Sequence, residues 1–201
     1  MIILHFYDTI LVLLLAKGMS SLDINHLKVR KANRKDIKAI MDIENESFAK
    51  GIRENEKVML ERIETFSDGF LVLVDQSDIP LGYISSELWG YKKNIDKTEF
   101  TLGHSIVDKH RNDGQEIYIS STALAKRLRG KGYGHILFEH LLHNIKLDYS
   151  NIKSSILIVS KDWTKAQTIY QSNGFVKVDL IDNFFVTSEN ISDGIIMRKK
   201  L

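Results

Sequence analysis

The chain has 201 residues and a mass of 23.1 kDa, which suits one domain or one domain with an appendage. Hydrophobic residues make up 43% and charged residues 27%, ordinary values that exclude a disordered, collagen-like or coiled-coil chain. The net charge of +2 lacks the basic excess typical of a dedicated nucleic-acid-binding protein. The chain has no cysteine, which excludes disulfides, thiolate catalysis and cysteine-ligated zinc, and we expect a cytoplasmic protein.

The first 18 residues differ from the rest, because residues 10–16 read ILVLLLA, the most apolar run in the chain. Asp8 interrupts the apolar stretch, which disfavours a membrane-spanning helix. A signal peptide is disfavoured because no Lys or Arg precedes the run and no A-x-A site follows it. Two interpretations stay open: an over-extension that is not native, with Met19 as the natural start, or a short amphipathic cap docked on the domain or on a membrane surface. We expect one domain over residues 19–201.

The N-terminal half of this domain is predicted to hold a short strand, two helices and a hairpin. Turn-forming residues at 76–78 separate the last two strands. The polar residues 90–115 follow as a long loop, and loops of this length are usually functional or disordered. The predicted elements are strand 26–32, helices 36–43 and 56–66, and strands 69–74 and 81–88.

The C-terminal half is predicted to alternate strands and helices. Asp162 is the expected N-cap of the last helix, and Asn173-Gly174 is its expected left-handed end. The predicted elements are strand 116–124, a helix over 133–146, strand 155–159, the helix that follows Asp162, and strands 175–180 and 195–198. The element order indicates an α/β fold with a mixed sheet.

The sequence R-G-K-G-Y-G at 129–134 joins a predicted strand to a predicted helix. Glycine lacks the Cβ that would keep an anion away from main-chain amides, and a helix N-terminus adds about half a positive charge. The pattern therefore favours a pyrophosphate ligand. It departs from the nucleotide-binding patterns, because Lys131 precedes Gly rather than Ser or Thr, and His135 stands at the third glycine of a dinucleotide fingerprint. The other interpretation is a turn that only lets strand and helix pack closely.

The chain resembles the GCN5-related N-acetyltransferase (GNAT) superfamily in the signature Arg129, Gly132 and Gly134. Further matches are Ala166, Tyr170 and the Gly174-Phe175 pair after the last helix. Residues 116–175 match strongly, and residues 27–90 match more loosely. The resemblance implies a mixed, mostly antiparallel central sheet flanked by helices on both faces, as in acyl-CoA N-acyltransferases.

The resemblance also implies acetyl-CoA as donor, no metal, and a primary amine as acceptor. The pyrophosphate is expected on the amides of 130–134, and the pantetheine arm along the fourth strand, which should splay from the fifth. The implied cofactor-binding residues are Thr122, Ala123, Leu124, Arg129, Gly130, Lys131, Gly132, Tyr133 and Gly134. We expect a small-molecule or peptide amine as partner, no nucleic acid and no membrane; a homodimer stays open.

Catalysis poses two proton problems. An alkyl amine with a pKa of about 10.4 is almost wholly protonated at neutral pH, so exposing its lone pair costs roughly 4–5 kcal/mol. Glu116 is our first candidate for the general base, although Tyr118 stands at the position of the family's fourth-strand glutamate. Glu44 and Glu46 are second candidates, as bases or amine-binding carboxylates. Tyr170 matches the family's tyrosine that protonates the departing thiolate.

Several positions depart from branches of the family. Trp163 replaces an asparagine that contacts the cofactor, Ser120 and Tyr118 replace paired histidines, and Ile158 replaces a glutamate. A non-catalytic acyl-CoA-binding regulatory module is therefore the alternative to an N-acetyltransferase, and a nucleotide-phosphate site is a third interpretation. The seven histidines form no H-E-x-x-H pattern, and we expect no metal site.

Overall fold

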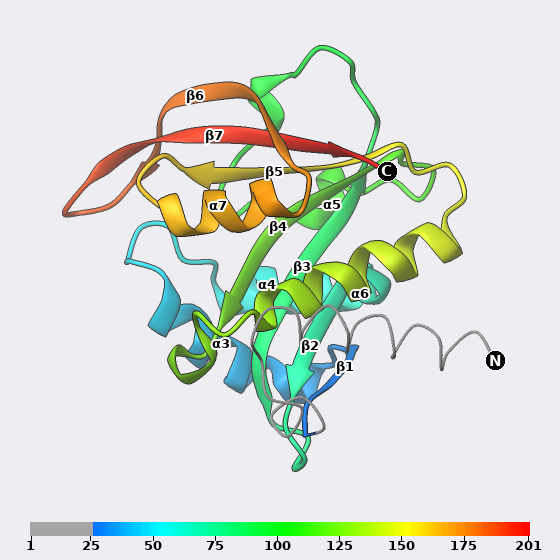
Figure 1. The fold of residues 1–201 in the computed structure, drawn as a ribbon, viewed down its shortest axis with the longest axis vertical. Helices are drawn as coiled ribbons and strands as arrows, with labels where there is room; N and C mark the ends of the chain where they lie inside the picture. The colour runs from blue at the N-terminus through cyan, green and yellow to red at the C-terminus, as the bar shows by residue number, and fades with distance from the viewer. Residues whose placement is uncertain (1–25) are drawn as a thin grey trace.

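The structure is a computed structural model that describes residues 26–201, so the expectations for residues 1–18 lie outside the described residues. The described part contains one seven-stranded sheet with helices on both faces (Figure 1). Its strands are β1 (Lys28–Lys31), β2 (Phe70–Val74), β3 (Pro80–Trp89), β4 (Glu116–Leu124), β5 (Ser154–Ser160), β6 (Val176–Val186) and β7 (Ile191–Lys200).

The strand order is β1-β2-β3-β4-β5-β7-β6, and every neighbouring pair is antiparallel except β4 and β5. This confirms the mixed, mostly antiparallel sheet and the hairpin that the sequence predicts. The main helices are α3 (Ile37–Ser47), α4 (Glu56–Thr65), α6 (Tyr133–Asp148) and α7 (Thr164–Ser172), and a short helix α5 (Ile106–Lys109) lies within the predicted long loop.

The two faces of the sheet carry different cores. Helix α6 presents a stripe of apolar side chains that includes Leu137, Leu141 and Ile145 to one face, where α7 packs as well. Helices α3 and α4 cover the other face through side chains such as Ile40 and Met59. Because strands β2 and β3 lie between both layers, all their residues are buried, which explains the nearly continuous apolar run in β2.

Strands β4 and β5 pair over four residues and then separate. The pairing runs from Glu116 opposite Ser154 to Ile119 opposite Leu157, while β4 continues to Leu124 with β3 as its partner. The register of β3 and β4 shifts next to Ser85, so Ser120 forms a bulge at the point of separation. The sheet therefore opens between the second half of β4 and β5, as the family resemblance implies (Figure 1).

Two local predictions need correction or extension. Asp162 does not cap α7: the helix starts after Trp163 without a side-chain cap, and the carboxylate of Asp162 accepts a hydrogen bond from Asn190 instead. The predicted end is confirmed, since Gly174 has a φ of 86°. Strands β6 and β7 are longer than predicted. The prediction was too short because polar residues in these strands hide the alternation of apolar and polar positions in the sequence. No helix among residues 26–201 combines the length and apolar character needed to cross a bilayer.

A buried ion pair ties α4 to the segment before it. The guanidinium of Arg62, 1% exposed, lies 2.9 Å from the carboxylate of Glu54, which is also buried. We expect Arg62→Met to lower the free energy of unfolding by about 3–5 kcal/mol, because it leaves a buried carboxylate without its partner. Arg34→Met, whose partner Glu64 is exposed, should cost at most about 1 kcal/mol. Urea unfolding of both variants measures the difference, and equal losses would contradict this account.

Candidate functional site

The glycine-rich turn places two glycines in the left-handed region. Gly130 has a φ of 77° and Gly132 a φ of 82°, and Gly132 is the N-cap of α6. Glycine brings no side chain to this cap, so no cap side chain stands between a ligand and the start of the helix. A Cβ at Gly130 would meet nothing within 4 Å. The turn therefore presents an open main-chain surface with the donors that an anion requires.

Basic side chains surround this turn, namely Lys126, Arg127, Arg129 and Lys131. Arg129 also braces it: its Nε donates to the carbonyl of Leu124 over 2.8 Å, and its Nη2 donates to Ser47 Oγ over 3.0 Å. These contacts tie the end of β4, the end of α3 and the turn together. The predicted signature arginine thus holds the shape of the turn and adds to its positive potential.

The predicted cofactor-binding residues of β4 lie beside the turn. The hydroxyl of Thr122 donates to the carbonyl of Tyr83, and Ala123 packs under α3 and α4. Beyond Ile119, β4 has no strand partner on its β5 side among residues 26–201. The structure thus brings the predicted strand residues and the glycine-rich turn into one continuous main-chain surface.

Tyr170 lies on α7, the helix that follows β5 in the chain. Its ring packs against Phe138 and Phe175, with centroids 5.5 and 6.1 Å away. Its hydroxyl makes no hydrogen bond within the described part of the chain. Burial raises the pKa of Tyr170 to about 12, so the phenol keeps its proton throughout the physiological range.

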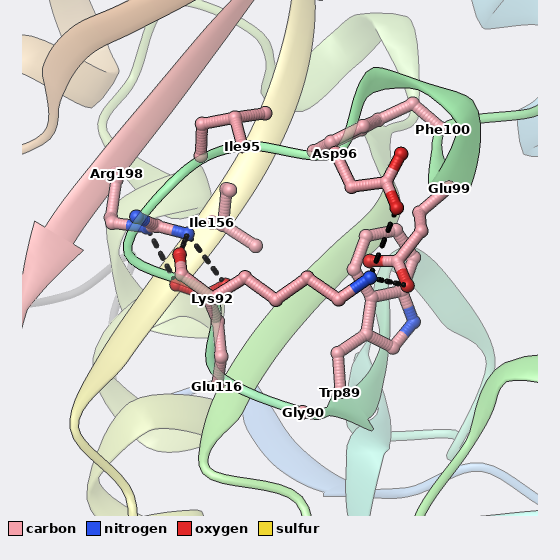
Figure 2. A pocket seen from close by; sticks show the side chains of 10 residues that line it. All are labelled: Trp89, Gly90, Lys92, Ile95, Asp96, Glu99, Phe100, Glu116, Ile156 and Arg198. Atoms are coloured by element: carbon pink, nitrogen blue, oxygen red, sulfur yellow. Dashed lines mark hydrogen bonds and ion pairs between the residues drawn. The ribbon is translucent and has the colours of Figure 1, made fainter.

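Glu116 lies at the closed end of the opening, where β4 and β5 are still paired (Figure 2). Its carboxylate is 2% exposed, lies 2.7 Å from Arg198 Nε and accepts from Arg198 Nη2 over 2.9 Å. Ser154 Oγ donates to the same carboxylate over 2.6 Å. Lys92 and the segment that follows it cover this end of the sheet. These contacts favour a structural role for Glu116, and its role as general base stays a prediction.

The other two predicted carboxylates face different regions. Glu46 is exposed near the turn, and one of its oxygens accepts from the main-chain N–H of Lys126 over 2.8 Å. Glu44 is 1% exposed and lies between α3 and the sheet, where it accepts hydrogen bonds from the hydroxyl of Tyr83 and the N–H of Glu54. The pair that the sequence suggests is therefore split: Glu46 belongs to the turn, and Glu44 to the interior.

A buried polar chamber between the sheet and helices α3 and α4 was not predicted. Besides Glu44 and Tyr83 it contains Glu54, Arg62, Glu87 and His104. Among the described residues, two nitrogens of Arg62 and one oxygen each of Glu54 and Glu87 have no hydrogen-bond partner. The signal in the sequence was Glu87, a charged residue within the predicted strand 81–88.

His104 and Glu87 form a close pair in this chamber, with 2.5 Å between Nε2 and Oε1. Burial by itself lowers the pKa of His104, but the hydrogen bond to Glu87 and the charge of that carboxylate raise it above its ordinary value. The pair places one of the two histidines of the predicted long loop against the sheet. Because the chamber holds three carboxylates against one arginine and this histidine, it favours cations.

Trp163 directly precedes α7, and its ring contacts aromatic side chains from two other segments. Its ring lies 5.7 Å from that of Phe48, after α3, and 5.1 Å from that of Phe185 in β6. An ideal Cβ on Gly51 would lie 2.9 Å from the carbonyl of Val186, so the segment after α3 also touches β6 through its main chain. These contacts form a wall on the α3 side of the opening.

The described residues contain no group of three or more His, Asp or Glu side chains placed to hold a metal ion. His135 does have a carboxylate neighbour, Glu139, at 3.3 Å on the same helix, but it also contacts Asn173 at the end of α7. Its observed contacts are those of a side chain that joins two helices.

Comparison with protein families identifies residues 30–184 as an acetyltransferase (GNAT) domain. Since this match spans most of the chain, the protein belongs to the GNAT acetyltransferase family. A sequence search of curated proteins found no match. Family membership and the observed sheet agree with the fold that the signature at 129–134 implies.

Solved structures share the fold at low identity. The loading GNATL domain of CurA from Lyngbya majuscula has a TM-score of 0.73 at 14% identity, covering 87% of this chain and 98% of that one. The ribosomal-protein-S18-alanine N-acetyltransferase from Escherichia coli has a TM-score of 0.63 at 17% identity, covering 87% and 93%. GphF, a GNAT-like decarboxylase in complex with isobutyryl-CoA, has a TM-score of 0.70 at 16% identity, covering 86% and 98%. The same fold is thus shared by an N-acetyltransferase and a decarboxylase.

We expect Glu116→Gln to lower the free energy of unfolding by about 3 kcal/mol, because it leaves the mostly buried Arg198 without an opposite charge. Lys92→Gln is the control, since it removes only exposed ion pairs to Asp96 and Glu99 and should leave the free energy of unfolding nearly unchanged. Urea unfolding gives both values. A fully stable Glu116→Gln variant would contradict the structural role and favour the predicted catalytic one.

Proposed function

We propose that the protein transfers an acetyl group from acetyl-CoA to a primary amine, by direct attack of the amine within a ternary complex. One observation carries the proposal: the free edge of β4 ends at Leu124, and residues 125–131 connect it to a left-handed glycine at the start of α6. An extended arm along the strand and a diphosphate at the helix start fit this arrangement in a single molecule. Coenzyme A is such a molecule.

The phosphate end is supported by main-chain donors and by charge. The amides of 130–134 provide the donors, the α6 dipole adds about half a positive charge, and Lys126, Arg127 and Lys131 add full charges. The pantetheine arm would pair with β4 at Thr122 to Leu124 as an added strand. Main-chain amides of this stretch would also polarise the thioester carbonyl, and one such donor is worth about 3–4 kcal/mol in the transition state.

The chemistry requires two proton transfers. The ammonium must lose a proton before its nitrogen can attack the carbonyl carbon, and the C–S bond then breaks as the thiolate leaves. Tyr170 would supply the proton to that thiolate, since its phenol stays protonated and α7 follows directly after β5, the strand that separates from β4. Glu116 would have to give up its ion pair with Arg198 before it could accept a proton from the amine. Glu44 is instead hydrogen-bonded to the hydroxyl of Tyr83, on the strand next to β4.

The acceptor would be a small molecule or the N-terminus of a peptide. The wall formed by Phe48, Trp163 and Phe185 borders the side from which it would approach, and three carboxylates in the polar chamber suit a cationic amine. The same wall also supports the alternative function, a regulatory module that binds acyl-CoA without transferring the acyl group. The wall would narrow the path by which an acceptor amine reaches the acyl group. A cytoplasmic location and a homodimer stay predictions.

We expect Gly132→Ala to weaken coenzyme A binding about tenfold, equivalent to about 1.4 kcal/mol, because a side chain strains the left-handed N-cap and tilts the amides that follow. Isothermal titration calorimetry with coenzyme A measures the loss. Gly103→Ala is the control, since Gly103 also has a positive φ, of 67°, but lies in a different loop. If both variants bound coenzyme A as tightly as the wild type, the site at α6 would be ruled out.

The function itself is tested by thiol release from acetyl-CoA with a panel of primary amines. We expect turnover with at least one amine class, and Tyr170→Phe should lower kcat about 100-fold without changing the affinity for coenzyme A. Tyr149→Phe is the control, because its hydroxyl bonds to Asp68 away from the opening. Tight binding of coenzyme A without thiol release from any amine would favour the regulatory module.

A further inference from the structure

A chain of hydrogen bonds runs from the free part of β4 into the polar chamber. Ser121 Oγ lies 2.9 Å from the hydroxyl of Tyr83, and that hydroxyl donates to the carboxylate of Glu44. Tyr83 and Glu44 are fully buried, while Ser121 is partly exposed. In this series of hydrogen bonds Ser121 is therefore the outer group, which a molecule bound between β4 and β5 can reach. Glu44 is the inner group.

The chemistry of the groups fixes the direction of the chain. A phenol has one hydrogen, and Tyr83 gives it to Glu44. The hydrogen between Tyr83 and Ser121 must therefore come from Ser121. The lone pairs of Ser121 Oγ are then left to accept a hydrogen bond from the side of the opening. The three groups are aligned to move a proton inward.

The surroundings of Glu44 suit a proton acceptor whose pKa lies above that of an ordinary glutamate. The groups that face it are Tyr83 from β3, Glu54 from the segment before α4, and Arg62 from α4. Burial raises the pKa of Glu44, and although the hydrogen bonds from Tyr83 and Glu54 lower it, the pKa stays above the ordinary value of a glutamate. Burial and the charge of Glu44 raise the pKa of Tyr83 well above its ordinary value, so the phenol relays a proton without losing one.

We propose that Ser121 receives the proton of the acceptor ammonium and that Tyr83 relays it to Glu44. The inference rests on the proposed function and deepens it. The ammonium gives one proton to Ser121 Oγ, the hydroxyl proton of Ser121 passes to Tyr83, and the phenol proton passes to Glu44. The carboxylate becomes a carboxylic acid, and the nitrogen gains its lone pair. The second proton that the nitrogen loses on forming the amide balances the one taken up by the thiolate, and Glu44 later returns its proton to solvent.

The position of Ser121 supports this role. It directly precedes Thr122 in the stretch of β4 that has no β5 partner, next to the strand bulge at Ser120. Ser120 itself donates to the carbonyl of Ser85 and lies 3.1 Å from its hydroxyl, so it takes no part in the chain to Glu44. The two adjacent serines of β4 therefore have different partners, and Ser120 provides a matched control for Ser121.

The experiment compares Ser121→Ala and Tyr83→Phe with Ser120→Ala. Each variant is assayed with a basic alkylamine that the wild type acetylates and with a fluorinated analogue of similar shape whose amine is far less basic. We expect kcat with the basic amine to fall about 100-fold in Ser121→Ala and Tyr83→Phe, and to stay at the wild-type value in Ser120→Ala. With the weakly basic analogue kcat should fall less than threefold in every variant, because this amine is already neutral and has no ammonium proton to give up before it attacks.

The pH profile provides a second readout. Below its pKa Glu44 is protonated and cannot accept, so kcat/KM should fall as the pH falls through a value above the ordinary glutamate range, and Glu44→Gln should abolish this acidic limb. Wild-type kcat with the basic amine in Ser121→Ala, or an unchanged limb in Glu44→Gln, would overturn the inference and leave the proposed function standing. Failure of the wild type to acetylate any amine would instead overturn the proposed function. If Tyr83→Phe does not fold, the partly exposed Ser121 still tests the path.

Discussion

The separation of β4 from β5 after four residue pairs is the constraint on which the site depends. Main-chain N–H and C=O groups require partners, and the second half of β4 finds them only toward β3 among the described strands. The main-chain bulge between β3 and β4 and the brace from Arg129 to Leu124 fix the shape of this exposed edge. The sheet thus contains a strand position that the chain itself does not fill, and an extended ligand can occupy it without opening the core.

Charge is divided between the two ends of this edge. Four basic side chains lie within residues 126–131, where the strand meets α6, and they suit a polyanionic group. Three buried carboxylates face one arginine and His104 in the chamber beneath α3 and α4, and they suit a cation. Because the two regions lie on different elements, an anionic donor and a cationic acceptor can be attracted at the same time without neutralising each other's sites.

Much of the fold and the coenzyme side of the site could be predicted from the sequence. The apolar stripe of α6 and the turn at 129–134 are local patterns of sequence. They can be recognised without knowing how the strands pair. The chamber could not be predicted, because Glu44, Glu87 and Arg62 come from three separate elements and meet only once the sheet and helices have packed. Glu116 shows the same limit: its place at the start of a strand suggested an accessible carboxylate, and only the register with β5 and β7 reveals Ser154 and Arg198 beside it.

The two proposed proton paths lie on opposite faces of the sheet. Tyr170 packs into the core beneath α6 and α7, whereas Glu44 and Tyr83 belong to the layer beneath α3 and α4. A continuous sheet would keep these layers apart, because its strands lie about 4.8 Å from one another and leave no passage. The opening between β4 and β5 is where groups from both faces can approach the same atoms. A proton can then leave the amine on one side while another reaches the thiolate on the other, so the separation of the two strands serves both binding and chemistry.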